Sequence, residues 1–199
     1  MLRLTHGLAA IGSLWAVLAH AQIANDAIVA AQAGTDSPEP IAATRSTNCV
    51  ALNMVDNRLQ PPDLYQAVGA CVITDHLDDA VRLFVIAGAL WRFDAQRVTD
   101  PSATLAGSQL VVNTFAPLPA ERRGAFKRMF DHMIASPEEI ARVCRRLQQM
   151  GTPQYFPRYM VLSGARAFNV QDPYKDALIP NFDSDEAWNK VLHQQVGCP

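Results

Sequence analysis

Histidine and carboxylate side chains are the first place to look for chemistry in this chain of 199 residues. The three histidines that follow residue 21 are His76, His132 and His193. None lies in an HExxH motif, and none forms a convincing i, i+4 pair with another metal-type ligand. We therefore expect structural or solvent roles for the histidines, and the sequence predicts no metal site.

Enzyme motifs that can be recognised locally are missing. The sequence contains no GxSxG, SxxK, Walker A or GxGxxG pattern, so we predict no catalytic residue and no cofactor. A hydrolase with two facing carboxylates leaves no local motif, and it stays an alternative. Nearly all of the acidic residues that such a hydrolase could use are explained as helix caps or as charges at helix ends. These acids are Asp94, Asp100, Asp131, Asp183, Asp185 and Glu186.

The four cysteines, Cys49, Cys71, Cys144 and Cys198, all follow residue 21. An even number in an exported chain indicates two disulfides, and the absence of a CxxC pair argues against zinc and against a thioredoxin-like motif. Three connectivities are possible. We favour Cys49–Cys71 with Cys144–Cys198, because each bond would tie a terminal segment to the nearest core helix.

Residues 1–21 have the pattern of a secretory signal peptide. Arg3 precedes an almost wholly apolar run over residues 7–18, and residues 19–21 form a small-x-small cleavage site. The run is short for a bilayer span, and an uncleaved anchor is the alternative. The sequence therefore predicts a periplasmic or secreted protein, cleaved near Ala21, with no stable membrane insertion of the mature chain.

The charge of the mature chain is mildly acidic. Because Arg3 is one of the 17 basic residues, its removal leaves 16 basic against 19 acidic residues. This balance argues against a nucleic-acid partner. Residues 22–45 are rich in alanine and contain glycine and proline, which predicts a flexible leader, and residues 46–199 suit a single domain.

Apolar residues recur at helical spacing through most of residues 46–199, and no sustained strand-like alternation is found. We predict an all-α fold, a compact and disulfide-stabilised domain of about six to seven helices built on antiparallel hairpins. The expected helices span roughly residues 63–74, 77–97, 101–115, 120–135, 137–150, 157–168 and 183–196, and a further short helical segment is expected around residues 49–57.

Local signals place several helix starts. Ser136, Pro137 and Glu139 match an N-cap, a first-turn proline and an N3 acid that can reach back to the Ser136 amide. Asp100 precedes a proline in the same way. Asp75 is expected to cap the helix that follows it.

Residues 64–98 are the expected centre of the core, with two apolar helices joined by a short turn. Ala80, Phe84 and Ala87 have the spacing of the small–aromatic–small positions in the second helix of a tetratricopeptide unit, and Leu64 suits the first helix. The segment therefore resembles a single tetratricopeptide or Sel1-like helical hairpin. The resemblance implies a hairpin and no catalytic residue, and no second copy follows in the sequence.

A polar cluster follows the most apolar run of the chain. Arg92, Asp94, Arg97 and Asp100 lie at the exit of the expected 77–97 helix. Two arginines and two aspartates at this place predict an ion-pair network that fixes the turn into the next helix. The functional alternative is that these four residues form the floor of a polar pocket.

Basic residues are concentrated in residues 120–150, and they are the first candidate binding surface. They form one basic outer face if the two helices of this region pair antiparallel, and such a face would speed docking of an acidic partner protein or an anionic envelope polymer. A solvated surface is the alternative. The candidate residues are Arg123, Lys127, Arg142 and Arg146.

An aromatic stretch is the second candidate binding surface. Aromatic residues and arginine are enriched in interface hot spots, although aromatic residues at near-helical spacing also complete cores. The candidate residues are Tyr155, Phe156, Arg158, Tyr159 and Met160.

In size, export and composition the chain resembles the small exported helical proteins that act as immunity partners of interbacterial toxins. The resemblance implies a periplasmic protein that binds another protein and occludes an envelope toxin, through the basic face or the aromatic stretch. The alternatives are an envelope hydrolase with paired carboxylates and a self-associating structural protein. The sequence leaves the oligomeric state open.

Overall fold

The computed structural model describes residues 41, 43–45 and 47–199, so the predicted signal peptide and leader residues 22–40 lie outside the described residues. In the described part the structure is helical, with one isolated β-bridge between Val98 and Leu178. The predicted all-α fold is confirmed. The α-helices are α2 (Pro61–Ile73), α3 (Leu77–Arg97), α4 (Ala106–Phe115), α5 (Ala120–Ile134), α6 (Pro137–Met150), α7 (Arg158–Val161) and α8 (Ser184–Val191).

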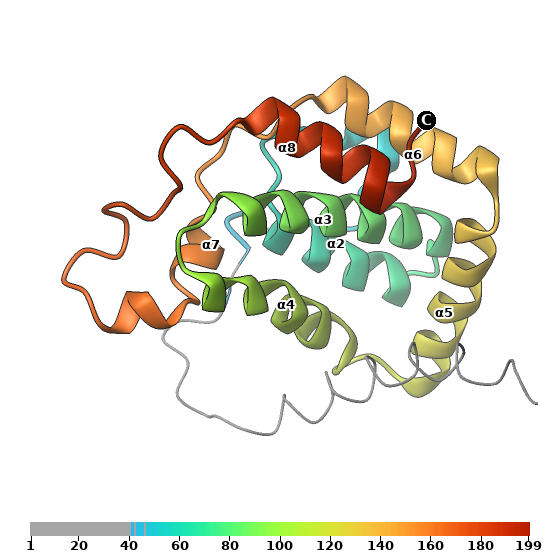
Figure 1. The fold of residues 1–199 in the computed structure, drawn as a ribbon. Helices are drawn as coiled ribbons and strands as arrows, with labels where there is room; N and C mark the ends of the chain where they lie inside the picture. Colours follow the sequence, from blue (N-terminus) through green and yellow to red (C-terminus); the bar gives the residue numbers. More distant parts are fainter. Residues whose placement is uncertain (1–40, 42, 46) are drawn as a thin grey trace, which may run out of the picture. The chain divides into compact units, whose positions relative to one another are not determined.

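Helix α3 lies in the middle of the described helices, between α8 and α6 on one side and α4 on the other (Figure 1). It contacts α2, α5, α6 and α8, and its contacts with α2 are the most extensive. Leu83, Ile86 and Leu90 of α3 are fully buried, and the small residues Ala80 and Ala87 are buried beside them. None of the described helices is both long enough and apolar enough to cross a membrane.

Phe84 joins four helices through aromatic contacts. Its ring meets Tyr65 of α2, Phe115 of α4, and Phe126 and Phe130 of α5 edge-on, with centroid distances of 5.5 to 5.8 Å. Such pairs add roughly 0.5–1.5 kcal/mol each beyond the burial of their area. The aromatic residue at this position of the hairpin is therefore a core residue.

The two disulfides have the favoured connectivity, Cys49–Cys71 and Cys144–Cys198. The first ties the segment before α2 to that helix. The second ties the chain end to α6, after α8 has passed into a π-helical turn, η4 (Leu192–Val196). Each bond restricts the unfolded chain and contributes roughly 2–4 kcal/mol to stability.

Three of the expected helices are shorter or interrupted. The first, over residues 49–57, is reduced to a 3-10 turn, η1 (Leu52–Met54), because a helix of that length is difficult to nucleate. The helix expected over 101–115 begins as a 3-10 turn, η2 (Pro101–Leu105). The helix expected over 157–168 is split into α7 and a 3-10 turn, η3 (Ala165–Phe168).

Gly164 gives the physical reason for the last interruption. A Cβ atom at this position would lie 2.3 Å from Asp100 Oδ2, so the chain passes too close to the Asp100 carboxylate for any larger residue. This contact belongs to the tertiary fold, and helix periodicity carries no information about it.

Two of the expected caps are modified by the fold. Ser136 caps α6 and accepts a hydrogen bond from the Glu139 amide, as predicted. The Ser136 amide donates to the Met133 carbonyl at 3.0 Å and not to the Glu139 carboxylate, which pairs with Arg82 at 2.8 Å. The prediction that Asp75 caps α3 is wrong: it adopts a left-handed conformation in the turn, and His76 is the N-cap residue.

The fully buried carboxylate of Asp63 joins the residues before the domain to α2. It accepts hydrogen bonds from the Thr44 hydroxyl at 3.1 Å, the Arg45 amide at 2.9 Å and the Gln60 amide at 3.0 Å. The last residues of the predicted leader therefore pack against α2.

Candidate functional site

The buried carboxylate of Asp94 connects the end of α3 to the aromatic stretch. Arg97 donates to Asp94 Oδ1 through Nε at 3.0 Å and Nη2 at 2.6 Å. The hydroxyls of Tyr155 and Tyr159 both donate to Oδ2 at 3.0 Å. The Arg97 guanidinium also lies over the Phe93 and Tyr155 rings, at 4.9 and 5.1 Å from their centroids. Two hydrogen bonds, from the Tyr155 and Tyr159 hydroxyls, thus fix the segment 155–161 to α3, and the two from Arg97 hold the carboxylate that accepts them.

Burial dominates the protonation of this cluster. It raises the pKa of Asp94 to about 6, although the Arg97 charge and the hydrogen bonds from Arg97 and the two tyrosines act in the opposite direction. Burial, followed by the charge of Asp94, also raises the pKa values of Tyr155 and Tyr159 well above their usual range. Because Asp94 is fully buried and both of its oxygens are occupied, its role in this geometry is to position the aromatic stretch.

The predicted network of Arg92, Asp94, Arg97 and Asp100 is only partly correct. Asp94 and Arg97 form the expected pair. Arg92 is exposed and lies over the Trp91 ring at 5.1 Å. The prediction is wrong for Arg92 and for Asp100, because they make other contacts.

Asp100 caps η2 and does not pair with an arginine of α3. Its carboxylate accepts from the Ser102 amide at 2.9 Å, the Ser102 hydroxyl at 2.6 Å and the Arg166 amide at 2.8 Å. The hydrogen bond from the Ser102 hydroxyl is the main reason that the pKa of Asp100 is lowered.

The aromatic stretch divides between core and surface. Tyr159 and Met160 are buried, so the prediction that they belong to a binding surface is wrong, and Tyr155 is partly buried. Their side chains complete the core beside α3. Phe156 and Arg158 point outwards and are exposed.

Phe156 and Arg158 meet a residue that the sequence analysis did not select. Phe156 packs edge-on against Tyr174 with the ring centroids 5.8 Å apart, and the Arg158 guanidinium lies 5.7 Å from the Tyr174 centroid. Tyr174 stands in a proline-bounded loop. The presence of aromatic and aliphatic residues inside a proline-bounded loop is the sequence signal that could have identified Tyr174.

Exposed apolar side chains are concentrated in this loop and in the segment before it, from residue 156 onwards. In the part of the chain that the structure describes, nine large hydrophobic side chains are exposed, and five of them fall within residues 156–179. We call these five, together with Arg158, the apolar loop surface. The five are Phe156, Phe168, Val170, Tyr174 and Ile179, which are 37% to 56% exposed.

The loop that carries this surface is held in place by backbone contacts. The Arg166 guanidinium donates to the carbonyls of Pro173 at 3.3 Å and Lys175 at 2.5 Å. The Thr99 amide donates to the Ala177 carbonyl at 2.9 Å, and the Ile179 amide donates to the Arg97 carbonyl at 2.8 Å. The exposed side chains are therefore presented on an ordered backbone.

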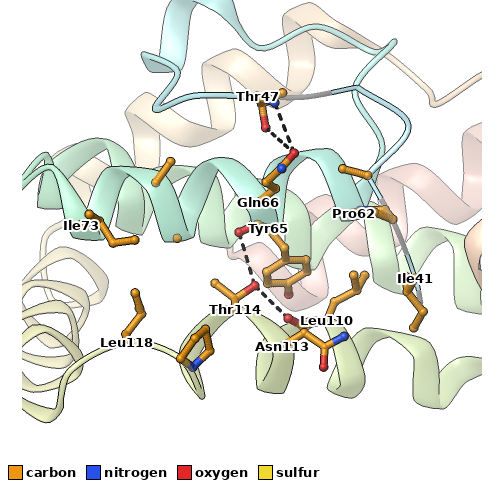
Figure 2. A pocket seen from close by; sticks show the side chains of 14 residues that line it. Ile41, Thr47, Pro62, Tyr65, Gln66, Ile73, Leu110, Asn113, Thr114 and Leu118 are labelled. Carbon is orange, nitrogen blue, oxygen red and sulfur yellow. Dashed lines mark hydrogen bonds between the residues drawn. The ribbon is translucent and has the colours of Figure 1, made fainter. Parts of the chain in front are cut away.

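An open groove of about 460 Å³ lies between α2, α4 and the segment before α2. Figure 2 shows Ile73 and Leu118 at one end of it and Ile41 and Pro62 towards the other. No charged side chain lines it. Some of its polar groups are bonded within the protein, as in the 3.3 Å hydrogen bond from the Thr114 hydroxyl to the Tyr65 carbonyl of α2. The groove suits an uncharged, apolar group, and the sequence analysis did not identify it because its walls come from distant segments.

The predicted basic face does not form as one surface. Figure 1 shows α6 turning away from α5, so the antiparallel pairing on which the prediction depended is absent. On α5, Arg123 donates to the Leu118 carbonyl and Lys127 pairs with Asp131. Arg142 and Arg146 of α6 line a separate cavity together with a residue of α3.

The three histidines are exposed and lie on different elements. His193 Nδ1 is 2.9 Å from the Cys198 carbonyl oxygen. In the described ranges, no three His, Cys, Asp or Glu side chains gather in the arrangement of a metal site.

Comparisons with protein-family models, with curated proteins and with solved structures find no match to this chain.

Proposed function

We propose that this is an exported binding protein that associates with another protein through the apolar loop surface. The observation that carries the proposal is the concentration of exposed apolar side chains on a hydrogen-bonded loop. Exposed apolar patches mark interaction sites, and aromatic residues with arginine dominate the energetics of protein interfaces.

The ordered backbone of the loop favours binding for an energetic reason. Association costs roughly 0.5–1.5 kcal/mol for each flexible side chain that it immobilises, and more when a loop must be ordered. Here Tyr155 and Tyr159 are fixed by Asp94 on either side of Phe156 and Arg158. The groove of Figure 2 offers no comparable set of exposed aromatic and arginine side chains, so we place the contact on the loop.

The finer proposal concerns the partner. A signal-like N-terminus and two disulfides fit a protein of the cell envelope. An envelope toxin that is occluded by stoichiometric binding is the partner we propose, and the effect would be inhibition without catalysis.

The test is capture of a partner from an envelope extract, followed by a titration. We expect saturable binding by one protein, weakened at least about tenfold when Phe156→Ser and Tyr174→Ser are combined, since hot-spot truncations cost about 2 kcal/mol or more. Leu105→Ser and Ile134→Ser are matched controls, because these side chains are 70% and 51% exposed on other elements.

Three outcomes would contradict the proposal. The first is the absence of any saturable protein partner, and the second is an equal effect of the loop and control variants. The third is retention of a second copy of this chain, with loop-dependent association in light scattering, which would favour the self-associating alternative.

A further inference from the structure

A cavity of about 370 Å³ lies between α3, α6 and η1, away from the apolar loop surface. Arg82 of α3 and Arg142, Arg145 and Arg146 of α6 line it, and Asp79 is the one carboxylate in the lining. We call these four arginines the arginine pocket. It is a different place from the proposed protein-binding surface and is argued independently of it.

Two of the four guanidiniums are held by carboxylates at the edge of the pocket. Arg82 Nε lies 2.8 Å from Glu139, and its side chain is 17% exposed. Arg142 lies 3.3 Å from Glu138 and 3.6 Å from Glu139. Each guanidinium has five N–H donors, so these contacts orient the groups and leave further donors available.

The other two arginines pair with no carboxylate of the described residues. Arg146 donates to the Val55 carbonyl and to the Gln149 side-chain oxygen, while its Nε is buried and has no hydrogen-bond partner in the structure. Arg145 is exposed, and no carboxylate of the described residues lies within ion-pair distance of it. The buried Arg146 Nε is closed off from solvent, so the donors available to a ligand are those of the exposed Arg145 and the remaining N–H groups of the other three arginines.

The helix dipole does not explain this arrangement by itself. The dipole favours cations in the last turn of a helix, and the last turn of α6 holds no basic residue. It does not account for Arg82, which arrives from α3 and lines the same cavity. Arg142 and Arg146 are also like charges one turn apart, and of these two only Arg142 has carboxylate partners among the described residues.

We infer that the arginine pocket binds a small anion that carries two or more negative charges on phosphate or carboxylate groups. Guanidinium groups match these oxyanions geometrically, and paired N–H···O bonds to them are stronger than neutral ones. Guanidiniums that arrive from two helices can contact more than one oxyanion group of the same ligand. The cavity also has room, next to Leu52 and Asn53 of η1, for the part of the ligand that carries the charged groups.

Calorimetric titration of the purified full chain tests the inference, with pyrophosphate and citrate as probes at constant ionic strength and sodium chloride as the reference. We expect saturable one-to-one binding of at least one probe. Arg145→Gln should weaken it about tenfold, because the variant removes a charged donor that hydrogen-bonds the anion. Arg128→Gln is the matched control, because Arg128 is an exposed arginine on α5 that does not line the pocket.

The probes separate the two chemistries. Tighter binding of pyrophosphate supports a phosphoryl ligand, and tighter binding of citrate supports a carboxylate ligand. No saturable binding up to about 10 mM, or an equal loss with Arg128→Gln, would overturn the inference, since general charge screening would then explain the signal.

Discussion

Two carboxylate–cation pairs in this protein have the same closest nitrogen–oxygen distance in opposite surroundings. Arg97 lies 2.6 Å from Asp94 within α3, and Lys127 lies 2.6 Å from Asp131 within α5. The side chains of Arg97 and Asp94 are 8% and 0% exposed, whereas those of Lys127 and Asp131 are 74% and 53% exposed. Distance is thus constant between the two pairs, and burial is the variable.

The comparison teaches that distance alone does not set the energetic role of an ion pair. An exposed pair is screened by water and contributes between about 0 and 1 kcal/mol. A buried pair pays a large desolvation cost, so its net contribution is small while the loss of one partner is severe. Asp94 also accepts two tyrosine hydroxyls, which makes it the support of Phe156 and Arg158 on the apolar loop surface.

Asp94→Ala should have the largest effect. The change leaves the Arg97 charge buried without its carboxylate and removes the acceptor of both tyrosine hydroxyls. We expect a loss of about 3–5 kcal/mol in the free energy of unfolding, measured by urea denaturation at pH 7 with the disulfides intact.

A double variant sharpens this prediction. Replacing both partners, as Asp94→Leu with Arg97→Met, removes the buried charges together and should recover most of the loss. A loss below about 1 kcal/mol for Asp94→Ala would mean that the buried pair behaves like the exposed one, and the comparison would fail.

The pH dependence of stability should give the next largest effect. Burial raises the pKa of Asp94 to about 6, above its ordinary value of 3.8. The folded protein therefore binds this proton more tightly than the unfolded chain. The protonated Asp94 carboxyl therefore stabilises the folded state. Its contribution to the free energy of unfolding is complete below about pH 4, declines as the pH rises to about 6, and amounts to at most about 3 kcal/mol.

The measurement is the difference in unfolding free energy between the wild type and Asp94→Asn from pH 4 to pH 7.5. Subtraction is needed because Asp56, Asp100 and Glu139 have lowered pKa values and act in the opposite direction, stabilising the fold as the pH rises. A difference that stays level through this range would contradict the raised pKa.

Local features of the fold were accessible from the sequence. Ser136 and Pro137 predicted the start of α6, because capping and proline placement depend on adjacent residues. The disulfide pairing followed from tying each terminal segment to its nearest helix. Helical spacing also identified the centre of the core on α3.

Most features that depend on distant residues were not accessible; the Cys144–Cys198 bond, over 54 residues, is an exception because four cysteines allow only three pairings. The tyrosines that bond Asp94 lie 61 and 65 residues further along the chain, and no spacing rule links them. Glu139 illustrates the same limit. Its carboxylate was predicted to accept from the Ser136 amide, but it accepts from Arg82, which lies 57 residues earlier in the chain. The candidate surface was therefore found only in part: Phe156 and Arg158 were selected, while Tyr174 was not.

The exposed pair should have the smallest effect, and a double-mutant cycle on Lys127→Ala and Asp131→Ala measures it. We expect a coupling energy of about 0.3–0.5 kcal/mol that decreases as salt is added. Asp131→Ala alone should be close to neutral, because alanine favours the helix and a negative charge near the C-terminal end of α5 opposes the helix dipole. A coupling above about 1 kcal/mol, or one insensitive to salt, would show that burial is not what separates the two pairs.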